Sequence, residues 1–412
     1  MSWKKKYEEN WGRLGMRYKT YTMEDALEAI IDYRGKTPKK SEKGIPTLSA
    51  KSVKNNHIDY DSCYYISSGE YKRFMVRGLP QIGDVLLTTE APLGMVAQLD
   101  RNDVGIAQRL LTLRGKQGIL DNEYLLYYLQ SPTGQALLRA RETGTTVTGI
   151  KQSEFRKVQI DIPDIENQRK IGGILRRLDD KIAVNDNINK NLEQQIEMIL
   201  IKTINDADTQ PVKLGDYLYI KGRIGWKGLK KSEYLPISDY RIINGESLTL
   251  SGIDWNKAGY ISAERYEESP EIMLNIGDIL LSKDGTIGKI GYVDKLDAPT
   301  SVASGIFVIR NTRQAEISTQ FIYYLLKSKL FKAFIASRTE GSVIPHLYQK
   351  DFMEFEFQLP SPDDMKIFDN TTAAMFSLVF SNLNENERLI HLRDSLLPKL
   401  MSGELDISEL DL

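Results

Sequence analysis

The sequence is poor in the residues that form disulfides, metal sites and membrane spans. Cys63 is its one cysteine, so an internal disulfide and a thiolate zinc cluster are excluded, and we expect an ordinary reduced thiol. The three histidines, His57, His346 and His391, do not have the spacing of metal ligands. No run of eighteen apolar residues is present, and the basic start MSWKKKYEEN lacks the apolar segment of an export signal. We therefore expect no metal in this chain, no membrane association and a cytoplasmic location.

Catalytic motifs are also missing. A methyltransferase that acts on a base would need a glycine-rich loop opening a helix and an Asn/Asp-Pro-Pro-aromatic motif, and neither occurs. The glycine cluster 285–289 lacks the length of a phosphate-binding loop and its Lys-Ser/Thr ending. The acidic stretches 163–166 and 362–366 superficially resemble nuclease metal sites, but an acidic first turn that complements a helix dipole explains them better. We expect neither catalysis nor a cofactor in this chain.

The size and charge distribution of the chain indicate several domains. Its 412 residues, 41% hydrophobic and 27% charged, can form two or three domains with real cores. The net charge of −1 argues against a basic coat protein for nucleic acid. Residues 1–160 contain 25 Lys+Arg and 18 Asp+Glu, and residues 211–360 contain 19 and 18. Residues 161–210 contain 7 and 10, and residues 361–412 contain 4 and 10, so these two stretches suit a protein partner better than phosphate.

An internal repeat organises the sequence. IGDVLLTTEAPLG from Ile82 matches IGDILLSKDGTIG from Ile276 at an offset of 194, and each predicts a turn followed by a buried strand. EYLLYYLQS from Glu123 matches QFIYYLLKS from Gln320 at an offset of 197, as an amphipathic helix. The offset of 197 persists to the strands VQIDIP and FEFQLP. The sequence therefore predicts two copies of one α/β (α+β) domain.

Each copy is followed by a helix with coiled-coil spacing. Apolar and small residues recur alternately every four and three positions from Ile171 to Thr203, and again 197 positions later from Phe368 to Leu400. Paired asparagines occupy equivalent seam positions, where polar side chains weaken a coil but set its register and partner. These asparagines are Asn185, Asn189, Asn382 and Asn386. We expect the two helices to pack together.

The duplication predicts a pseudo-twofold arrangement. Two domain-plus-helix units related in this way would have antiparallel helices and globular heads at opposite ends. A helix of about 32 residues is roughly 48 Å long, which is on the scale of one to one and a half turns of duplex DNA. The helices could therefore act as a spacer between two readers; the alternative is a dimerisation arm without that role.

Loops of both copies contain Lys, Arg, Gly, Ser and Thr in mixtures that bind phosphates and base edges. An ordinary solvated loop is the alternative for any single group. The candidate DNA-binding residues in the first copy are Arg34, Lys36, Lys39, Lys51, Lys54, Lys72, Arg73, Thr145, Thr148 and Lys151. Those in the second copy are Lys221, Arg223, Lys227, Lys283, Ser342, His346 and Tyr348.

Several segments together resemble a known family. They are the repeated IGD(V/I)LL strand, the passage DIPDIENQRKIGGILRRLDDKI, the asparagine-rich helix, the stretch 223–227 and the ending LIHLRDSLLPKLMSGEL. Over nearly its whole length, the chain resembles the specificity subunit of Type I restriction-modification systems. One departure is at 362–366, which replaces the Glu166-Asn167-Gln168 of the first copy and implies an altered docking surface.

The resemblance implies a non-catalytic subunit that recognises a bipartite double-stranded DNA target. It implies target recognition domains at 1–163 and 209–360, with spacer helices at 164–208 and 361–412. It also implies two methyltransferase subunits and two restriction subunits as partners, with S-adenosylmethionine, ATP and magnesium bound by those partners. The alternative is a coiled-coil assembly scaffold without sequence-specific DNA binding.

Overall fold

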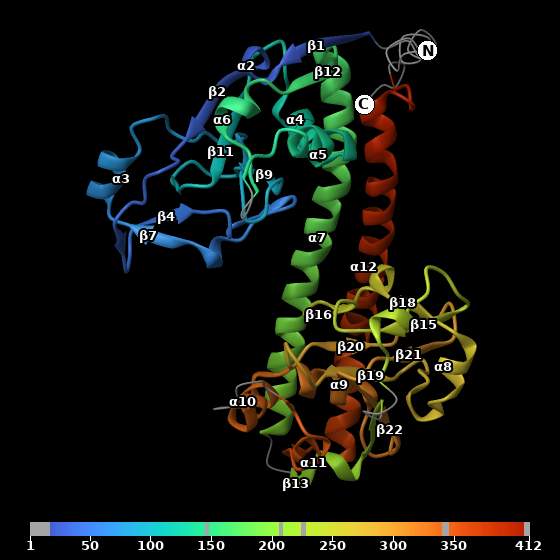
Figure 1. The fold of residues 1–412 in the computed structure, drawn as a ribbon. Coiled ribbons are helices and arrows are strands. Elements are labelled where there is room, and N and C mark those ends of the chain that lie inside the picture. Colours follow the sequence, from blue (N-terminus) through green and yellow to red (C-terminus); the bar gives the residue numbers. More distant parts are fainter. Residues whose placement is uncertain (1–16, 145–147, 206–208, 224–227, 340–345, 408–412) are drawn as a thin grey trace. The chain divides into compact units, whose positions relative to one another are not determined.

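The computed structural model describes residues 17–144, 148–205, 209–223, 228–339 and 346–407 (Figure 1). The chain forms two compact units. The first unit contains Met1–Asn185 and Glu385–Leu412, and the second contains Asp186–Asn384. The first unit is therefore assembled from both ends of the chain, and the second from its middle.

The first unit contains two four-stranded sheets. One is antiparallel with the order β2-β11-β8-β9, and the other has the order β10-β4-β7-β3 with a parallel β10–β4 pair. The ladders β1–β12 and β5–β6 complete the unit. The strands are β1 (Tyr18–Thr22), β2 (Leu27–Asp32), β3 (Lys40–Ser41), β4 (Ile45–Leu48), β5 (Val53–Lys54), β6 (His57–Ile58), β7 (Tyr64–Ile66), β8 (Val85–Thr88), β9 (Val96–Gln98), β10 (Gly105–Ile106), β11 (Leu110–Gly115) and β12 (Gln159–Pro163). The short helices are α2 (Met23–Ala26), α3 (Ser68–Phe74), α4 (Asn122–Gln130), α5 (Pro132–Arg139) and α6 (Gln152–Phe155).

The second unit repeats this plan. Its four-stranded sheet has the order β14-β22-β19-β20, and a smaller sheet has the order β18-β15-β21 with a parallel β15–β21 pair. The strands are β13 (Gln210–Lys213), β14 (Leu218–Gly222), β15 (Tyr240–Ile243), β16 (Leu248–Thr249), β17 (Gly252–Ile253), β18 (Gly259–Ile261), β19 (Ile279–Ser282), β20 (Ile290–Tyr292), β21 (Thr300–Val302), β22 (Ile306–Asn311) and β23 (Glu356–Leu359). The short helices are α8 (Ala263–Glu267), α9 (Thr319–Lys327), α10 (Lys329–Thr339) and α11 (Gln349–Met353).

The ladder registers confirm the internal repeat. Leu113 of β11 pairs with Val85 of β8, and Ile309 of β22 pairs with Ile279 of β19. Both β8 and β19 are buried along their whole length, as expected for an apolar run without alternation. The expected fold class, two repeated α/β domains with two long helices, is confirmed.

The aspartate of the repeated Ile-Gly-Asp motif holds the same buried ion pair in both units. Arg114 donates to both Asp84 oxygens at 2.8 Å, and Arg310 donates to both Asp278 oxygens at 2.7 Å. Both aspartates are 1% exposed. The hydrogen bond to the aspartate raises the pKa of each arginine. The Ile-Gly-Asp motif therefore has a structural role, because its ion pair fixes the turn before the buried strand.

Two long helices pass from one unit into the other, α7 (Ile165–Ile204) and α12 (Pro362–Ser402) (Figure 1). Within the first unit, Asp179 of α7 pairs with Arg393 of α12 at 2.7 Å, and Lys181 with Glu385 at 3.1 Å. Within the second unit, the α7 segment packs on the earlier part of α12. Because the partner's number falls as the α7 number rises, the helix segments run antiparallel.

The seam asparagines lie in two matching pairs. Asn185 donates to Asn386 Oδ1 at 2.8 Å within the first unit, and Asn382 donates to Asn189 Oδ1 at 2.8 Å within the second. All four are at most 7% exposed. Each unit therefore contains one asparagine pair across its two helix segments.

The two units fill the rest of the seam differently. In the first, the ion pair between Asp179 and Arg393 is mostly buried, and Tyr127 Oη donates to Asp179 at 2.6 Å. Burial alone would lower the pKa of Arg393, but the hydrogen bonds and charges of Asp179 and Asp394 together outweigh it and raise the pKa. At the equivalent positions, the second unit has Phe376 and Ile196, and the Phe376 ring packs against Tyr324. A polar contact in one unit is thus an apolar contact in the other.

The helices also complete the cores of the globular parts. Leu397 and Leu400 of α12 join α4 and Ile171 of α7 in one buried cluster of the first unit. In the second unit, Ile196 and Leu200 of α7 join α9 in the corresponding cluster. Each core therefore needs the start of one long helix and the end of the other.

The altered entry to the second long helix is a change inside the domain. Gln168 is fully buried, and its amide donates to Ile119 O at 2.9 Å and accepts from Asp121 N at 2.9 Å. Met365, 197 positions later, is 5% exposed and belongs to the apolar core. Gln168 thus forms buried hydrogen bonds where Met365 packs in an apolar core. The replacement is therefore in the interior of the domain and not on its exposed surface.

Candidate nucleic-acid interface

Both units place the same loop junction at the end of the repeated strand. In the first, Thr89 N donates to Arg109 O at 3.0 Å, and Ile150 N donates to Thr89 O at 3.0 Å. In the second, Lys283 N donates to Gly305 O at 2.9 Å, and Leu347 N donates to Lys283 O at 2.9 Å. In the first unit, the bonds join the segment after β8 to the turn before β11 and to the loop before α6. In the second, they join the segment after β19 to the turn before β22 and to the loop before α11.

In the first unit, this junction brings together three predicted residues. Thr148 and Lys151 are exposed on the loop that precedes α6. Arg34, at the end of β2, donates from Nη2 to Ile150 O at 3.1 Å. These side chains therefore belong to one surface built from separate segments.

In the second unit, the junction brings together Lys283, His346 and Tyr348. His346 Nδ1 contacts Asp284 Oδ1, and the Tyr348 ring lies edge-on to the His346 ring at 4.4 Å. Tyr348 is 62% exposed. Lys283 Nζ lies 5.0 Å from the centre of the Phe307 ring. An exposed tyrosine beside a histidine can stack on a base or donate a hydrogen bond.

Most other predicted cations of the first unit lie on different elements. Lys39 N donates to Glu70 Oε1 at 2.9 Å, and Arg73 of α3 contacts Glu70 Oε2. The hydrogen bond from Lys39 lowers the pKa of Glu70. Lys72 is exposed on α3, and further exposed lysines are on the turn after β2 and around β5, namely Lys36, Lys51 and Lys54.

Arg223 does not occupy the exposed place expected of a phosphate contact. It is 2% exposed, and its guanidinium donates to Val302 O at 3.1 Å and to Ser301 Oγ at 3.3 Å. Burial lowers its pKa. Lys221, two residues earlier, is exposed on β14. Thr145, Lys227 and Ser342 lie outside the described residues.

Sequence reasoning missed two carboxylates at the junction. Glu90 follows Thr89, Asp284 follows Lys283, and each bridges to the loop opposite, at Gly149 and His346. Arg109 Nε lies 2.8 Å from Glu90 Oε1. A signal was present, because Glu90 and Asp284 occupy the same place in the two repeated stretches.

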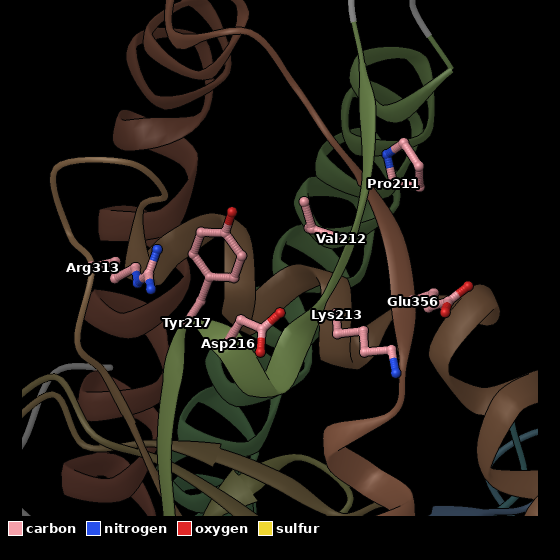
Figure 2. Close-up of a pocket in the computed structure, with 7 residues that line it drawn as sticks. All are labelled: Pro211, Val212, Lys213, Asp216, Tyr217, Arg313 and Glu356. Atoms are coloured by element: carbon pink, nitrogen blue, oxygen red, sulfur yellow. The ribbon is translucent and has the colours of Figure 1, made fainter.

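A cavity of about 640 Å³ lies elsewhere in the second unit, at the β13–β23 ladder. Figure 2 shows the residues that line it, among them Arg313 and Tyr217. The Arg313 guanidinium lies 5.2 Å from the centre of the Tyr217 ring. Lys213 is paired with Glu354 at 2.6 Å and Arg313 with Glu316 at 3.5 Å. Both cations that line this cavity are therefore already paired with carboxylates.

Within the described ranges, no three or more His, Cys, Asp and Glu side chains are grouped so that they could hold a metal ion. The same ranges contain no helix with the length and apolar character needed to cross a bilayer.

A family model described as the Type I restriction modification DNA specificity domain matches residues 17–194 and again residues 207–388. The chain belongs to this family. It contains two copies of the family's domain, and the boundary between them lies where the internal repeat begins again. The family confirms the interpretation of the chain as a DNA specificity subunit, a class whose members are not themselves catalytic.

Similar proteins agree with this assignment. The chain is 26% identical over 395 residues to the Type I restriction enzyme MjaIX specificity subunit of Methanocaldococcus jannaschii, covering 89% of this chain and 88% of that protein. It is 22% identical to the HindI specificity subunit of Haemophilus influenzae, covering 78% and 86%. The crystal structure of a Type I restriction-modification S subunit from M. genitalium has the same fold, with a TM-score of 0.57 at 18% identity, covering 94% of this chain and 96% of that one.

Proposed function

We propose that this chain is the DNA-reading subunit of a Type I restriction-modification enzyme, in which each unit reads one half of a split double-stranded target. The observation that carries the proposal is the pair of family domains, each with the same loop junction but different side chains on it. The shared main-chain scaffold supports a common way of docking on DNA. The differing side chains support recognition of a different sequence by each unit.

The long helices are the proposed spacer. We place the target recognition domains at 1–163 and 209–360, and the spacer helices at 164–208 and 361–412. A helix of 40 residues such as α7 is about 60 Å long at 1.5 Å per residue. The asparagine pairs support the role, because they favour one register of the helix segments over its neighbours.

Catalysis would then come from partners. We propose a cytoplasmic assembly with two methyltransferase subunits and two restriction subunits, which bind S-adenosylmethionine, ATP and magnesium. The acidic charge of residues 161–210 and 361–412 supports a protein partner on these helices, because it disfavours phosphate.

Selection from random DNA tests the proposal. The chain would be combined with its cognate methyltransferase subunit, and the chain alone would serve as a control. Two short motifs separated by a fixed gap are the expected result. If nothing is enriched at low salt, the chain is an assembly scaffold and the proposal is wrong.

A further inference from the structure

The loop junction holds a carboxylate at the same place in both units. The carboxylates belong to Glu90, 27% exposed, and Asp284, 44% exposed. Each follows the residue whose N–H and C=O form the two main-chain bonds of the junction. The backbone therefore delivers both carboxylates to one equivalent position.

The side chain that pairs with this carboxylate comes from a different segment in each unit. In the first, Arg109 pairs with Glu90, and Gly149 occupies the loop opposite. In the second, the position of Arg109 is Gly305, and the position of Gly149 is His346, which contacts Asp284. Each unit thus has glycine at the position where the other unit has the partner of the acid, and both units have the acid.

Space at the junction accounts for the exchange. A Cβ on Gly149 would lie 2.6 Å from Thr89 O and 2.9 Å from Glu90 Cβ, so the first unit has no room for a side chain there. A Cβ on Gly305 would lie 3.5 Å from Asp284 Cβ, an ordinary contact. The first unit therefore cannot place a side chain at position 149, where the second has His346, and its carboxylate pairs with Arg109 instead.

Stability does not explain why the pair is present in both units. Arg109 adopts φ +71°, a conformation that is costly for any residue except glycine, whereas an exposed ion pair contributes little to folding. A strained residue that holds a partly exposed acid is typical of a binding site. The neighbouring exposed side chains, Thr148 and Lys151 in one unit and Tyr348 in the other, are of the kinds that contact DNA.

We propose that Glu90 and Asp284 are specificity-determining residues, each accepting a hydrogen bond from the exocyclic amino group of a cytosine or adenine in its own half-site. Carboxylates accept from base amino groups in the major groove. A carboxylate has about four acceptor positions, so the ion pair leaves capacity for a base. The paired side chain, Arg109 or His346, holds the acid in one orientation. This inference rests on the proposed function.

The experiment is random-site selection with the complex of this chain and its methyltransferase subunit, using Glu90→Ala and Asp284→Ala separately. Each variant should lose discrimination at one base pair of one half-site by about fivefold or more, and the affected half-site should differ between the variants. The other half-site is the internal control. Asp103→Asn, which breaks an exposed pair with Arg101 in the first unit, should leave both motifs unchanged.

Unchanged base preferences in both alanine variants, with a split site selected by the wild-type complex, would overturn this inference and leave the proposed function intact. Uniformly weaker binding to all sequences would also overturn it, since that marks a structural role. If the wild-type complex selects no split site, both this inference and the proposed function are wrong.

Moving the partner of the carboxylate to the other segment gives a second test. His346→Ala should weaken discrimination in the half-site read by the second unit. Adding Gly305→Arg to it copies the arrangement of the first unit, and should restore the discrimination that depends on Asp284. If the double variant behaves like His346→Ala alone, the paired side chain does not position the acid.

Discussion

Asp84 and Asp278 are the residues of the repeated motif on which the turns before β8 and β19 depend. Each accepts two hydrogen bonds from an arginine and one from the backbone N–H three residues earlier, Gln81 N at 2.8 Å or Asn275 N at 2.7 Å. An acid of this kind is costly to lose, because its arginine, 16% exposed for Arg114 and 32% for Arg310, is then left mostly shielded from water without its counter-charge.

Asp84→Asn should therefore destabilise the first unit by about 3 kcal/mol, and Asp278→Asn should have a similar effect on the second. Chemical unfolding, followed by probes specific to each unit, measures this. Asp103→Asn is the matched control, because its pair is exposed and its loss should change the stability by less than about 0.5 kcal/mol. Equal effects of Asp84→Asn and Asp103→Asn would contradict the structural role of the motif.

The cap of α7 predicts a dependence of stability on pH. Burial alone would raise the pKa of Asp164, but hydrogen bonds from Asn167 and Glu166 N outweigh it and lower the pKa. The unfolded state then binds the proton more readily, so this stabilisation is complete above the unfolded pKa of about 3.9 and is lost as pH falls through the lower native pKa.

Asp164→Asn keeps an acceptor at the cap but does not titrate. The difference in unfolding free energy between wild type and this variant should be constant near neutral pH and shrink below about pH 4. Denaturant titrations at a series of pH values measure it. The cap of α12 is the internal control, because the Ser361 hydroxyl that accepts from Asp364 N does not titrate.

At the scale of the helices, the two units have different side chains at equivalent positions of the contact between α7 and α12. The first unit uses the pair Asp179–Arg393 with Tyr127, and the second uses Phe376 with Ile196. Arg393→Ala should destabilise the first unit by about 3 kcal/mol, because it leaves Asp179 buried without its cation.

The double variant Asp179→Phe with Arg393→Ile copies the second unit and should recover most of that loss, since a packed apolar pair commonly replaces a buried ion pair at little cost. Its unfolding midpoint, compared with that of Arg393→Ala, measures the recovery. A double variant no more stable than the single one would show that the two seams are not interchangeable.

We expect the asparagine pairs to fix the register of α7 against α12 at a cost to the stability of the two helices. Among the described residues, no donor reaches the buried Asn185 Oδ1, which makes the seam less stable than an apolar one. Asn185→Leu with Asn382→Leu should therefore stabilise the helices against heat while loosening their register. The spacing between half-sites selected from random DNA is the test, and an unchanged single spacing would count against the spacer role.

For the whole molecule, the duplication and the long helices could be predicted, because strand and helix periodicities survive where side chains differ. The sequence could not predict that the core of each unit is completed by the last turns of a long helix, α12 in the first unit and α7 in the second. A buried stripe such as Ile196 to Leu200 shows that something covers it, but not what. Likewise, the loop around Arg223 has the composition of a phosphate site whether its guanidinium meets phosphate or, as here, backbone carbonyl and serine.

Binding of DNA by the assembled protein should depend on salt through its exposed cations. Replacing Lys72 and Arg73 together with alanine should reduce the slope of log affinity against log salt by about 2 if both contact phosphate, without changing the selected motif. Titrations at several salt concentrations measure the slope. An unchanged slope would remove α3 from the proposed interface.

The first unit has a consequence for biosynthesis, because its core is closed by residues that are made long after the rest of it. Leu397, Leu400, Met401 and Ile407 are buried in the same cluster as residues near the start of the chain. On the ribosome, residues 186–384 are complete while the first unit still exposes an apolar face. A chain that stops before Glu385 would keep that face open and become a substrate for chaperones and proteases.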